Sequence, residues 1–224
     1  MCGRFTLKTP VETLAEVFEL PTVPELPPRF NIAPSDAVAA VRVAGPEPVR
    51  ELALLRWGLV PPWAEEPKAG SRMINARAET VATNGAFRSA FRRRRCLVPA
   101  DGFYEWQRQE HGKQPFYIHT RDDAPFAFAG LWEVWEGKDG TVLETCTVIT
   151  TEPNELMQPI HNRMPVILDR ADYARWLDPR MNDPELLKAF LRPFPSEKMT
   201  AYPVSRLVNS PSNDAPECLA PLPA

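Results

Sequence analysis

The spacing of apolar and polar residues predicts a few short helices. Apolar side chains recur at intervals of three or four residues in four segments, which begin near Thr9, Ala86, Asp169 and Asp183. In the first segment Thr9 is placed to cap the helix, Pro10 to occupy its first turn and Glu12 to complete a capping box. The third segment is expected to bury Tyr173, Trp176 and Leu177. The fourth is expected to bury Leu186, Leu187, Phe190 and Leu191.

Short segments rich in β-branched and aromatic residues predict strands. These segments are 37–44, 49–57, 96–98, 103–107, 115–120, 126–135, 141–150 and 165–168. The segments 126–135 and 141–150 are separated by five residues with two glycines, which favours a hairpin. The helices gather at the start, middle and end of the chain instead of alternating with the strands. This order predicts an α+β fold with a mainly antiparallel, strongly bent, barrel-like sheet and peripheral helices.

The 224 residues fit one large domain or two small ones. No low-complexity linker or internal repeat divides the chain. The 26 prolines concentrate in 21–34, at 61–62 and in the tail after Pro203, where each ring fixes a φ angle and stiffens a long loop. We therefore expect a single domain over residues 1–224 with a proline-rich C-terminal tail.

Composition narrows the class of protein further. No stretch approaches the roughly 18 apolar residues of a membrane span, and the first twenty residues lack the order of a signal peptide. We expect a cytoplasmic monomer. The four cysteines are scattered without a CxxC pair, and three histidines accompany them. This pattern argues against a zinc site and a disulfide framework, so no metal or other cofactor is expected. Cys96 and Cys146 lie in apolar runs and are expected to be buried.

Charge is unevenly distributed, although the net charge is −3. Between Gly70 and Glu110 there are eight arginines (72, 77, 88, 92, 93, 94, 95 and 108) and four acids (79, 101, 105 and 110), a local net charge of +4. The run 92–95 is typical of a solvated helix face. The alternative is phosphate binding, because the guanidinium fork matches phosphate oxygens.

Cys2 can become the first residue, because aminopeptidases remove methionine before small residues. The chain would then begin with an amine beside a thiol. The amine, with an ordinary pKa of about 7.7 to 8.0, is partly uncharged at neutral pH and can attack an aldehyde to form an imine. The thiol can then close a thiazolidine ring, and Gly3 allows the backbone to turn into a cleft. The alternative is a frayed terminus with an incidental cysteine.

Three polar motifs offer further chemistry. The segment 75–80 places Asn75, Arg77 and Glu79 at alternate positions, so they share one side of an extended strand, either in a site or facing solvent. Glu105 lies among aromatic residues, where desolvation would raise its pKa and make it a proton carrier. The alternative is that Glu105 is an edge-strand carboxylate that faces water. His161 lies on a loop, and histidine titrates near neutral pH, which makes it an acid/base candidate.

Seven motifs in order resemble the SRAP family, described as SOS response-associated peptidases and as sensors of abasic sites in single-stranded DNA. The motifs are MCGRF at 1–5, FNIAPS at 30–35, WGLVPPW at 57–63, NARAET at 75–80, CLVPADGFYEW at 96–106, HNRMP at 161–165 and VSRLVNSPSND at 204–214. The resemblance covers residues 2 to about 217, nearly the whole chain.

The resemblance implies a role for several residues. Cys2 would be the catalytic nucleophile, Asn75 and Glu105 would help to sense and process the abasic sugar, and His161 would stabilise or protonate the intermediate. Phosphates would be held by Arg4, Arg77 and Arg163. Bases or the unstacked nucleotide beside the lesion would pack against Pro34 and Trp63. The match at Arg88, a further phosphate candidate, is loose, since Asn84 and Gly85 offer no cation before it.

The function implied is an abasic-site processing enzyme that crosslinks itself to single-stranded DNA through Cys2 once Met1 is removed. The thiazolidine adduct would shield the lesion during the DNA damage response and DNA repair, with a possible lyase side reaction and without a cofactor. Such a protein would associate with the nucleoid. One alternative is an N-terminal-nucleophile peptidase or amidohydrolase that acts on peptides or on itself. Another is a non-catalytic nucleic-acid module, for which Cys2 would be dispensable.

Overall fold

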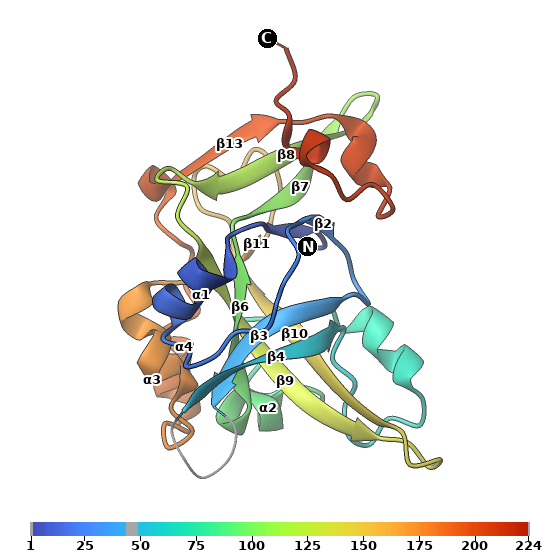
Figure 1. Ribbon diagram of the computed structural model, residues 1–224, viewed down its shortest axis with the longest axis vertical. Helices are drawn as coiled ribbons and strands as arrows, with labels where there is room; N and C mark the ends of the chain where they lie inside the picture. The colour runs from blue at the N-terminus through green and yellow to red at the C-terminus, as the bar shows by residue number, and fades with distance from the viewer. Residues whose placement is uncertain (1, 44–48, 224) are drawn as a thin grey trace.

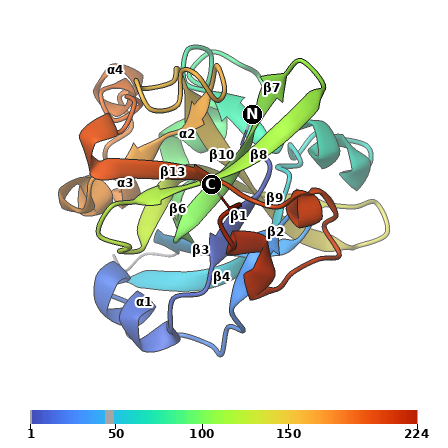
Figure 2. The ribbon, with the colours of Figure 1, turned by 90° about the horizontal axis from the view of Figure 1, so that it is seen from above.

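Two β-sheets form the body of the computed structural model, which describes residues 2–43 and 49–223. The first sheet contains, in spatial order, β13 (Met199–Pro203), β8 (Gly112–Thr120), β7 (Gly102–Gln109), β1 (Phe5–Leu7) and β2 (Arg29–Ile32). Its strand pairings are antiparallel. In Figure 1 this sheet lies above the second sheet, and Figure 2 shows β13 and β8 crossing over the strands below.

The second sheet closes on itself. Its ring runs through β10 (Val142–Thr151), β4 (Arg50–Trp57), β3 (Ala37–Val43), β6 (Arg95–Ala100) and β9 (Phe126–Glu136), which pairs again with β10. Three short strands extend it: β5 (Asn75–Arg77), β11 (Met164–Pro165) and β12 (Ile167–Leu168). Among the described strands β10 is parallel to β4 and β5, and the remaining pairings are antiparallel. The predicted α+β fold with a barrel-like sheet is confirmed.

The helices lie outside the barrel (Figure 1). They are α1 (Val11–Phe18), α2 (Arg88–Arg93), α3 (Tyr173–Leu177) and α4 (Pro184–Lys188). Short 3-10 turns are η1 (Pro67–Arg72), η2 (Arg170–Asp172), η3 (Ser196–Lys198), η4 (Arg206–Asn209) and η5 (Pro216–Leu219). No helix in the described part of the chain is long and apolar enough to span a membrane.

Most of the predicted helical faces are found in the structure. The inward face of α3 is confirmed, since Tyr173, Trp176 and Leu177 are all buried. The prediction for Leu186 is wrong, because this side chain is 57% exposed. The helix α4 is five residues long, so one side of a single turn can face the core, and Leu187 occupies that side.

The predicted cap of α1 is also wrong. The helix begins at Val11 with Pro10 as its N-cap and has no side-chain capping bond. The hydroxyl of Thr9 instead donates to the carboxylate of Asp101, which also accepts from the amides of Lys8 and Thr9. The Thr9 hydroxyl, which a local capping box would use, therefore forms a long-range hydrogen bond instead. It ties the start of α1 to the turn between β6 and β7.

The predicted hairpin is confirmed, with β9 and β10 paired from Glu136 opposite Val142 onward. The strand predicted at 37–44 is β3, and its last residue, Ala44, lies outside the described residues. Phe5 joins the two sheets, because its ring centroid lies 5.2 Å from that of Trp57 and 5.6 Å from that of Phe128. Both sheets thus share one core, as a single domain requires.

The C-terminal segment packs against the first sheet. A second apolar cluster forms between β7, β8 and this segment; it contains Tyr104, Tyr117, Val204, Val208 and Cys218. The side-chain amide of Asn31 donates to the carbonyls of Val208, Ser210 and Asn213. These contacts hold residues 204–218 over the strands that carry the N-terminal motif.

Candidate active site

The pairing of β1 with β7 brings the N-terminus beside Glu105. Phe5 lies opposite Phe103, and the amide of Tyr104 donates to the carbonyl of Arg4 at 3.0 Å. Cys2 is fully buried. Burial raises the pKa of the Cys2 thiol well above its ordinary value, and the nearby negative charge of Glu105 raises it further. Met1, whose removal the sequence predicts, lies outside the described residues.

Glu105 is a buried carboxyl at the centre of this site. It is 2% exposed, because β7 is an inner strand between β8 and β1. Desolvation raises the pKa of Glu105, while the proximity of His161 opposes that rise. The prediction of a desolvated carboxyl is therefore confirmed, and the alternative of an edge-strand carboxylate facing water is wrong.

His161 approaches Glu105 from the loop before β11. Its Nε2 lies 4.0 Å from Oε2 of Glu105. Its Nδ1 lies 3.1 Å from the amide nitrogen and 3.2 Å from the carbonyl oxygen of Arg163. A neutral ring can accept from the Arg163 amide at Nδ1, and a protonated ring can donate to the Arg163 carbonyl. The loop thus offers a hydrogen-bond partner to both protonation states.

Asn75 reaches the same end of the barrel through β5. This strand runs parallel to β10, with Asn75 opposite Val148, and β11 pairs with the end of β10. The motifs around Asn75 and His161 therefore lie on strands that share β10 as neighbour. The side-chain Nδ2 of Asn75 donates to the Ile74 carbonyl at 3.0 Å. Its Oδ1 is buried and has no hydrogen-bond partner among the described residues, so it can accept from a ligand.

These four side chains combine a nucleophile with groups that can carry protons and hold an oxygen or nitrogen of a substrate. In residues 2–43 and 49–223 no cluster of three or more His, Cys, Asp or Glu side chains is arranged to hold a metal ion. Cys2 could act here as a nucleophile, with Glu105 and His161 as candidate proton carriers.

Comparison with known proteins decides the family. The family described as SOS response associated peptidase (SRAP) matches residues 1–211. The chain belongs to the SRAP family. Its sequence is 46% identical over 223 residues to "Abasic site processing protein YoqW" of Bacillus subtilis strain 168, which covers 98% of this chain and 99% of that protein.

Similarity extends to animal proteins and to solved structures. "Abasic site processing protein HMCES" of Xenopus tropicalis is 38% identical over 194 residues, covering 76% of this chain and 57% of that longer protein. A crystal structure of a protein from Bacteroides thetaiotaomicron superposes with a TM-score of 0.88 at 27% identity, covering 99% of this chain and 100% of that one. A Bordetella bronchiseptica structure gives a TM-score of 0.77 at 28% identity, covering 91% and 100%.

Among the cations that the SRAP resemblance assigns to phosphates, Arg163 is held by the protein itself. Its Nη2 donates to Glu79 at 3.0 Å and to the carbonyl of Thr150 at 2.7 Å, and Nη1 pairs with the other oxygen of Glu79. The hydrogen bond from Arg163 lowers the pKa of Glu79. The NARAET motif contains Glu79, but its pairing with Arg163 is not evident from the sequence, since 84 residues separate the two.

Arg77 and Arg4 differ in their surroundings. Arg77 is exposed at the end of β5, opposite Thr150 of β10. Arg4 is half-buried, and Nη1 donates to Oδ1 of Asn31 at 2.9 Å and to the carbonyl of Val208 at 2.6 Å. Arg4 thus anchors the C-terminal segment to the N-terminal motif, a role that its position in the sequence did not indicate.

Trp63 and Pro34, the two residues expected to pack against bases, lie on loops. Trp63 is 68% exposed, and Pro34 is half-buried after β2. The loop with Trp63 is fixed by two glycines in close contact. Gly58 has a φ of +130°, and a Cβ on Gly70 would lie 2.4 Å from the Gly58 carbonyl oxygen. Larger residues at either position would displace the loop.

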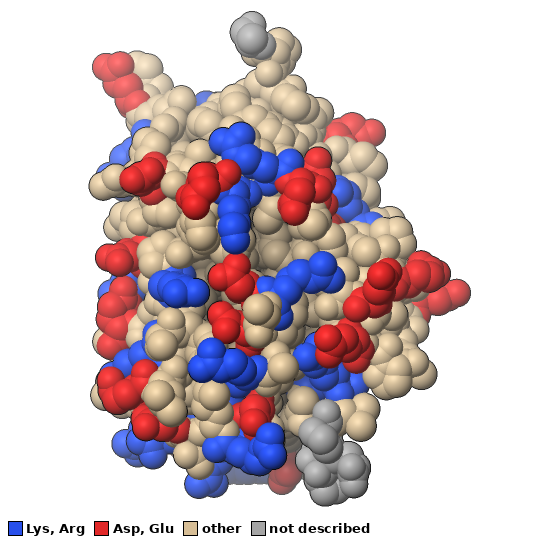
Figure 3. All heavy atoms as spheres, turned by 90° about the vertical axis from the view of Figure 1, so that its left-hand side faces the viewer, with Lys and Arg blue, Asp and Glu red and all other residues tan. Residues whose placement is uncertain are grey.

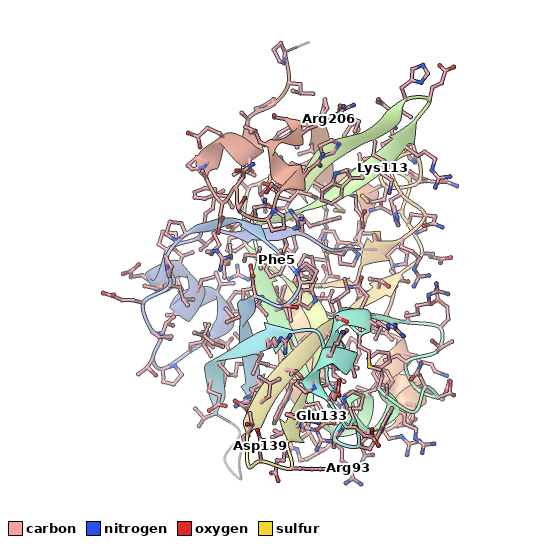
Figure 4. The ribbon with its side chains drawn as sticks, turned by 90° about the vertical axis from the view of Figure 1, so that its right-hand side faces the viewer. Phe5, Arg93, Lys113, Glu133, Asp139 and Arg206 are labelled. Atoms are coloured by element: carbon pink, nitrogen blue, oxygen red, sulfur yellow. The ribbon has the colours of Figure 1, made fainter. Side chains whose placement is uncertain are left out.

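Arg88 is not brought to the site. It is exposed on α2, where it lines a cavity of about 350 Å³ with Ser89, Arg92 and Arg93. Figure 1 shows α2 at the end of the molecule opposite β13, and Figure 4 shows Arg93 far below Phe5. The arginine run divides further along the chain: Arg94 pairs with Glu133 at 2.7 Å, and Arg95 is buried.

Proposed function

We propose that this protein captures abasic sites in single-stranded DNA as a covalent thiazolidine at Cys2, after loss of Met1. The observation that carries the proposal is the buried placement of Cys2 beside Glu105, which in turn lies 4.0 Å from His161. The abasic-site processing named for its bacterial and animal relatives supports this substrate. An abasic sugar opens to an aldehyde, the electrophile that an aminothiol captures.

The first step forms an imine. The uncharged amine of Cys2 attacks the aldehyde carbon, giving a carbinolamine that then loses its hydroxyl as water. Dehydration needs a proton donor. Glu105 suits this step because its raised pKa keeps a larger share of the carboxyl protonated near neutral pH. Asn75 can accept a hydrogen bond from the sugar through its buried Oδ1.

The second step closes the ring. The Cys2 sulfur adds to the imine carbon, the nitrogen takes up one proton, and the thiol gives up one proton. Because burial raises the pKa of the thiol, Cys2 enters this step protonated and needs a base. The carboxylate of Glu105 is the nearby acceptor, and His161 can relay the proton. The overall reaction joins protein and DNA and releases one water.

Preference for single strands rests on the exposed groups around the site. Trp63 offers an exposed aromatic face and Arg77 an exposed cation, the pairing that single-stranded nucleic acid binds through stacking and phosphate contact. Arg163 can hold a second phosphate if the strand displaces Glu79. The described α-helices span at most eight residues, which is short for reading a duplex groove in the usual way.

A peptidase is the competing function, since the SRAP family carries that word in its description. In that mechanism the Cys2 thiol attacks an amide and the terminal amine acts as the base. Turnover separates the two functions: a peptidase releases many products per protein molecule, whereas capture stops at one adduct per protein.

The test uses four substrates with the Met1-processed protein. These are an abasic single strand, the same strand with a tetrahydrofuran that lacks the aldehyde, an abasic duplex, and a mixed peptide library. We expect a denaturant-stable adduct with the abasic single strand, none with tetrahydrofuran, and slow reaction with the duplex. Repeated peptide cleavage without an adduct would reject the proposal in favour of the peptidase.

A further inference from the structure

A cationic groove lies on the side of β7 and β8 that faces away from Glu105. It is a cavity of about 380 Å³ lined by Trp106, Lys113, Arg206 and Asn209. Successive side chains of a strand point to opposite faces, so Glu105 points toward the site and Trp106 toward this groove. Figure 4 shows Arg206 and Lys113 close together above Phe5, which marks the N-terminal strand.

The hairpin brings like charges together at this groove. Arg108 of β7 lies directly opposite Lys113 of β8, so both side chains leave the same face of the hairpin. Arg206 reaches the same hairpin, because a Cβ on Gly112 would lie 3.9 Å from its Nη2. Like charges directly opposite each other destabilise a hairpin. Their juxtaposition therefore favours an anionic ligand that would offset the repulsion.

Acidic partners do not neutralise these cations within residues 2–43 and 49–223. None of Arg108, Lys113 and Arg206 forms an ion pair there. The face with α1, α3 and α4 differs, since basic and acidic side chains alternate across it (Figure 3). Glu110 lies in the hairpin turn as the nearest acid in sequence, which leaves the groove with a positive balance.

Trp106 is a fixed aromatic wall of the groove. Its Nε1 donates to Oδ1 of Asn209 at 2.7 Å, and the guanidinium carbon of Arg4 lies 5.9 Å from the ring centroid. The indole also packs against the cluster of Tyr104 and its neighbours. A half-buried indole held in one orientation among cations suits a nucleic-acid base and its phosphates better than an acidic peptide, which offers no ring to stack.

The groove and the active site lie on opposite faces of the same strand, β7. The N-terminal strand accompanies β7 as far as the hydrogen bond from Tyr104 to Arg4, and residues 106–109 extend beyond it. A strand that leaves Cys2 would reach the groove by passing over the edge of β7 beyond this hydrogen bond. We propose that the groove binds the single strand on one side of the abasic nucleotide, with its phosphates at Arg108, Lys113 and Arg206 and a base against Trp106.

This subsite rests on the proposed capture of abasic DNA, and oligonucleotide length tests it separately. The test variant is Lys113→Gln with Arg206→Gln, and the matched control is Lys138→Gln with Arg175→Gln, two exposed cations elsewhere. Each protein is incubated with a single strand that has ten nucleotides on each side of the abasic site. It is also incubated with strands shortened to two nucleotides on the 5′ side or on the 3′ side. Apparent affinity and the capture rate at saturating DNA are measured.

Wild type and control should lose about tenfold in affinity when one side, and not the other, is shortened. The groove variant should bind the long strand as weakly as wild type binds that shortened strand. Its salt dependence should fall by about 1.4 in log–log slope for two lost phosphate contacts, with the saturated capture rate unchanged. The proposal would be overturned if the affinity of the groove variant depended on strand length in the same way as that of wild type.

Two further outcomes separate the hypotheses. Absence of any adduct, together with weaker binding of undamaged strands by the groove variant, would reject the capture chemistry and keep the groove as a single-strand site. Tight binding of poly-glutamate that the groove variant loses, without any length dependence for DNA, would assign the groove to an acidic protein partner and reject the DNA subsite.

Discussion

Nε2 of His161 lies 4.0 Å from Oε2 of Glu105, although the two residues are 56 positions apart. Glu105 is held in the middle of β7, and His161 is held by the Arg163 backbone at Nδ1. A small shift on substrate binding would bring the two groups within hydrogen-bond distance, as catalytic contacts often tighten only in the complex. The pair joins a buried carboxyl to a ring that is 26% exposed to solvent.

Replacing Glu105 by Gln should slow adduct formation and its reversal by about 10²- to 10⁴-fold, because a catalyst of a reversible step acts in both directions. Binding of an undamaged strand should change little, since the lost charge is negative. Time courses of adduct and free strand measure both rates, with exposed Glu12→Gln on α1 as control. Wild-type rates in both directions would move the acid/base role to His161 or to water.

The same substitution should alter the pH dependence of stability. Folding raises the pKa of Glu105 from the ordinary 4.5, so the folded protein holds this proton more tightly than the unfolded chain. Wild type therefore loses unfolding free energy as pH rises above about 4.5, until the folded-state pKa is passed. Glutamine has no such proton. In thermal melts, the melting temperature of Glu105→Gln should therefore rise relative to that of wild type as the pH increases above 4.5, by about 2–4 °C per kcal/mol. A difference independent of pH would contradict the assigned shift.

Arg77→Gln should weaken binding of undamaged single strands of any sequence to the same extent, because phosphate contacts carry no sequence information. The log–log dependence of affinity on salt should lose about 0.7 in slope, the value for one contact on a single strand. Fluorescence anisotropy from 50 to 300 mM salt measures both. Arg175→Gln, exposed on α3, should leave the slope unchanged. An unchanged slope for Arg77→Gln would remove this residue from the phosphate contacts.

Arg95→Met should unfold the protein more easily without a direct effect on DNA binding. Arg95 is 4% exposed, and its guanidinium donates to the carbonyls of Phe91, Arg92, Trp176 and Asp178. Burial lowers its pKa to about 10. Removing it should cost about 3–5 kcal/mol, the range for breaking a buried charged network. Arg92→Met, on the exposed side of α2, should stay within about 0.5 kcal/mol in denaturant melts. Equal stability of the two variants would show that Arg95 is not structural.

Periodicity predicts the long strands of this fold and misses several short ones. The hairpin of β9 and β10 follows from alternation over many residues, and the buried face of α3 follows from helical spacing within a helix of five residues. The strands β1, β2 and β5 are three or four residues long and contain polar residues such as Thr6, Asn31 and Asn75. They form because a distant strand accepts their hydrogen bonds, which local pattern does not reveal.

The candidate site shows the same division. The chemical types of Cys2, Glu105 and His161 follow from the sequence and from its resemblance to the SRAP family. The sequence does not reveal that two of the arginines already have protein partners. Arg163 hydrogen-bonds to Glu79, and Arg4 to Asn31, only after the chain has folded. Arg92 and Arg95 are alike in sequence and opposite in exposure, since the turn from α2 into β6 directs one outward and the other into the core.

The most direct test of the capture chemistry is the intact mass of the protein after reaction with an abasic single strand. We expect the mass of the chain without Met1 plus that of the oligonucleotide, less one water, with the link mapped to Cys2 and unchanged by borohydride because the imine has closed to a thiazolidine. Cys2→Ser should give no adduct unless borohydride traps its imine. A full-mass adduct on protein that keeps Met1, or a link at another residue, would contradict the mechanism.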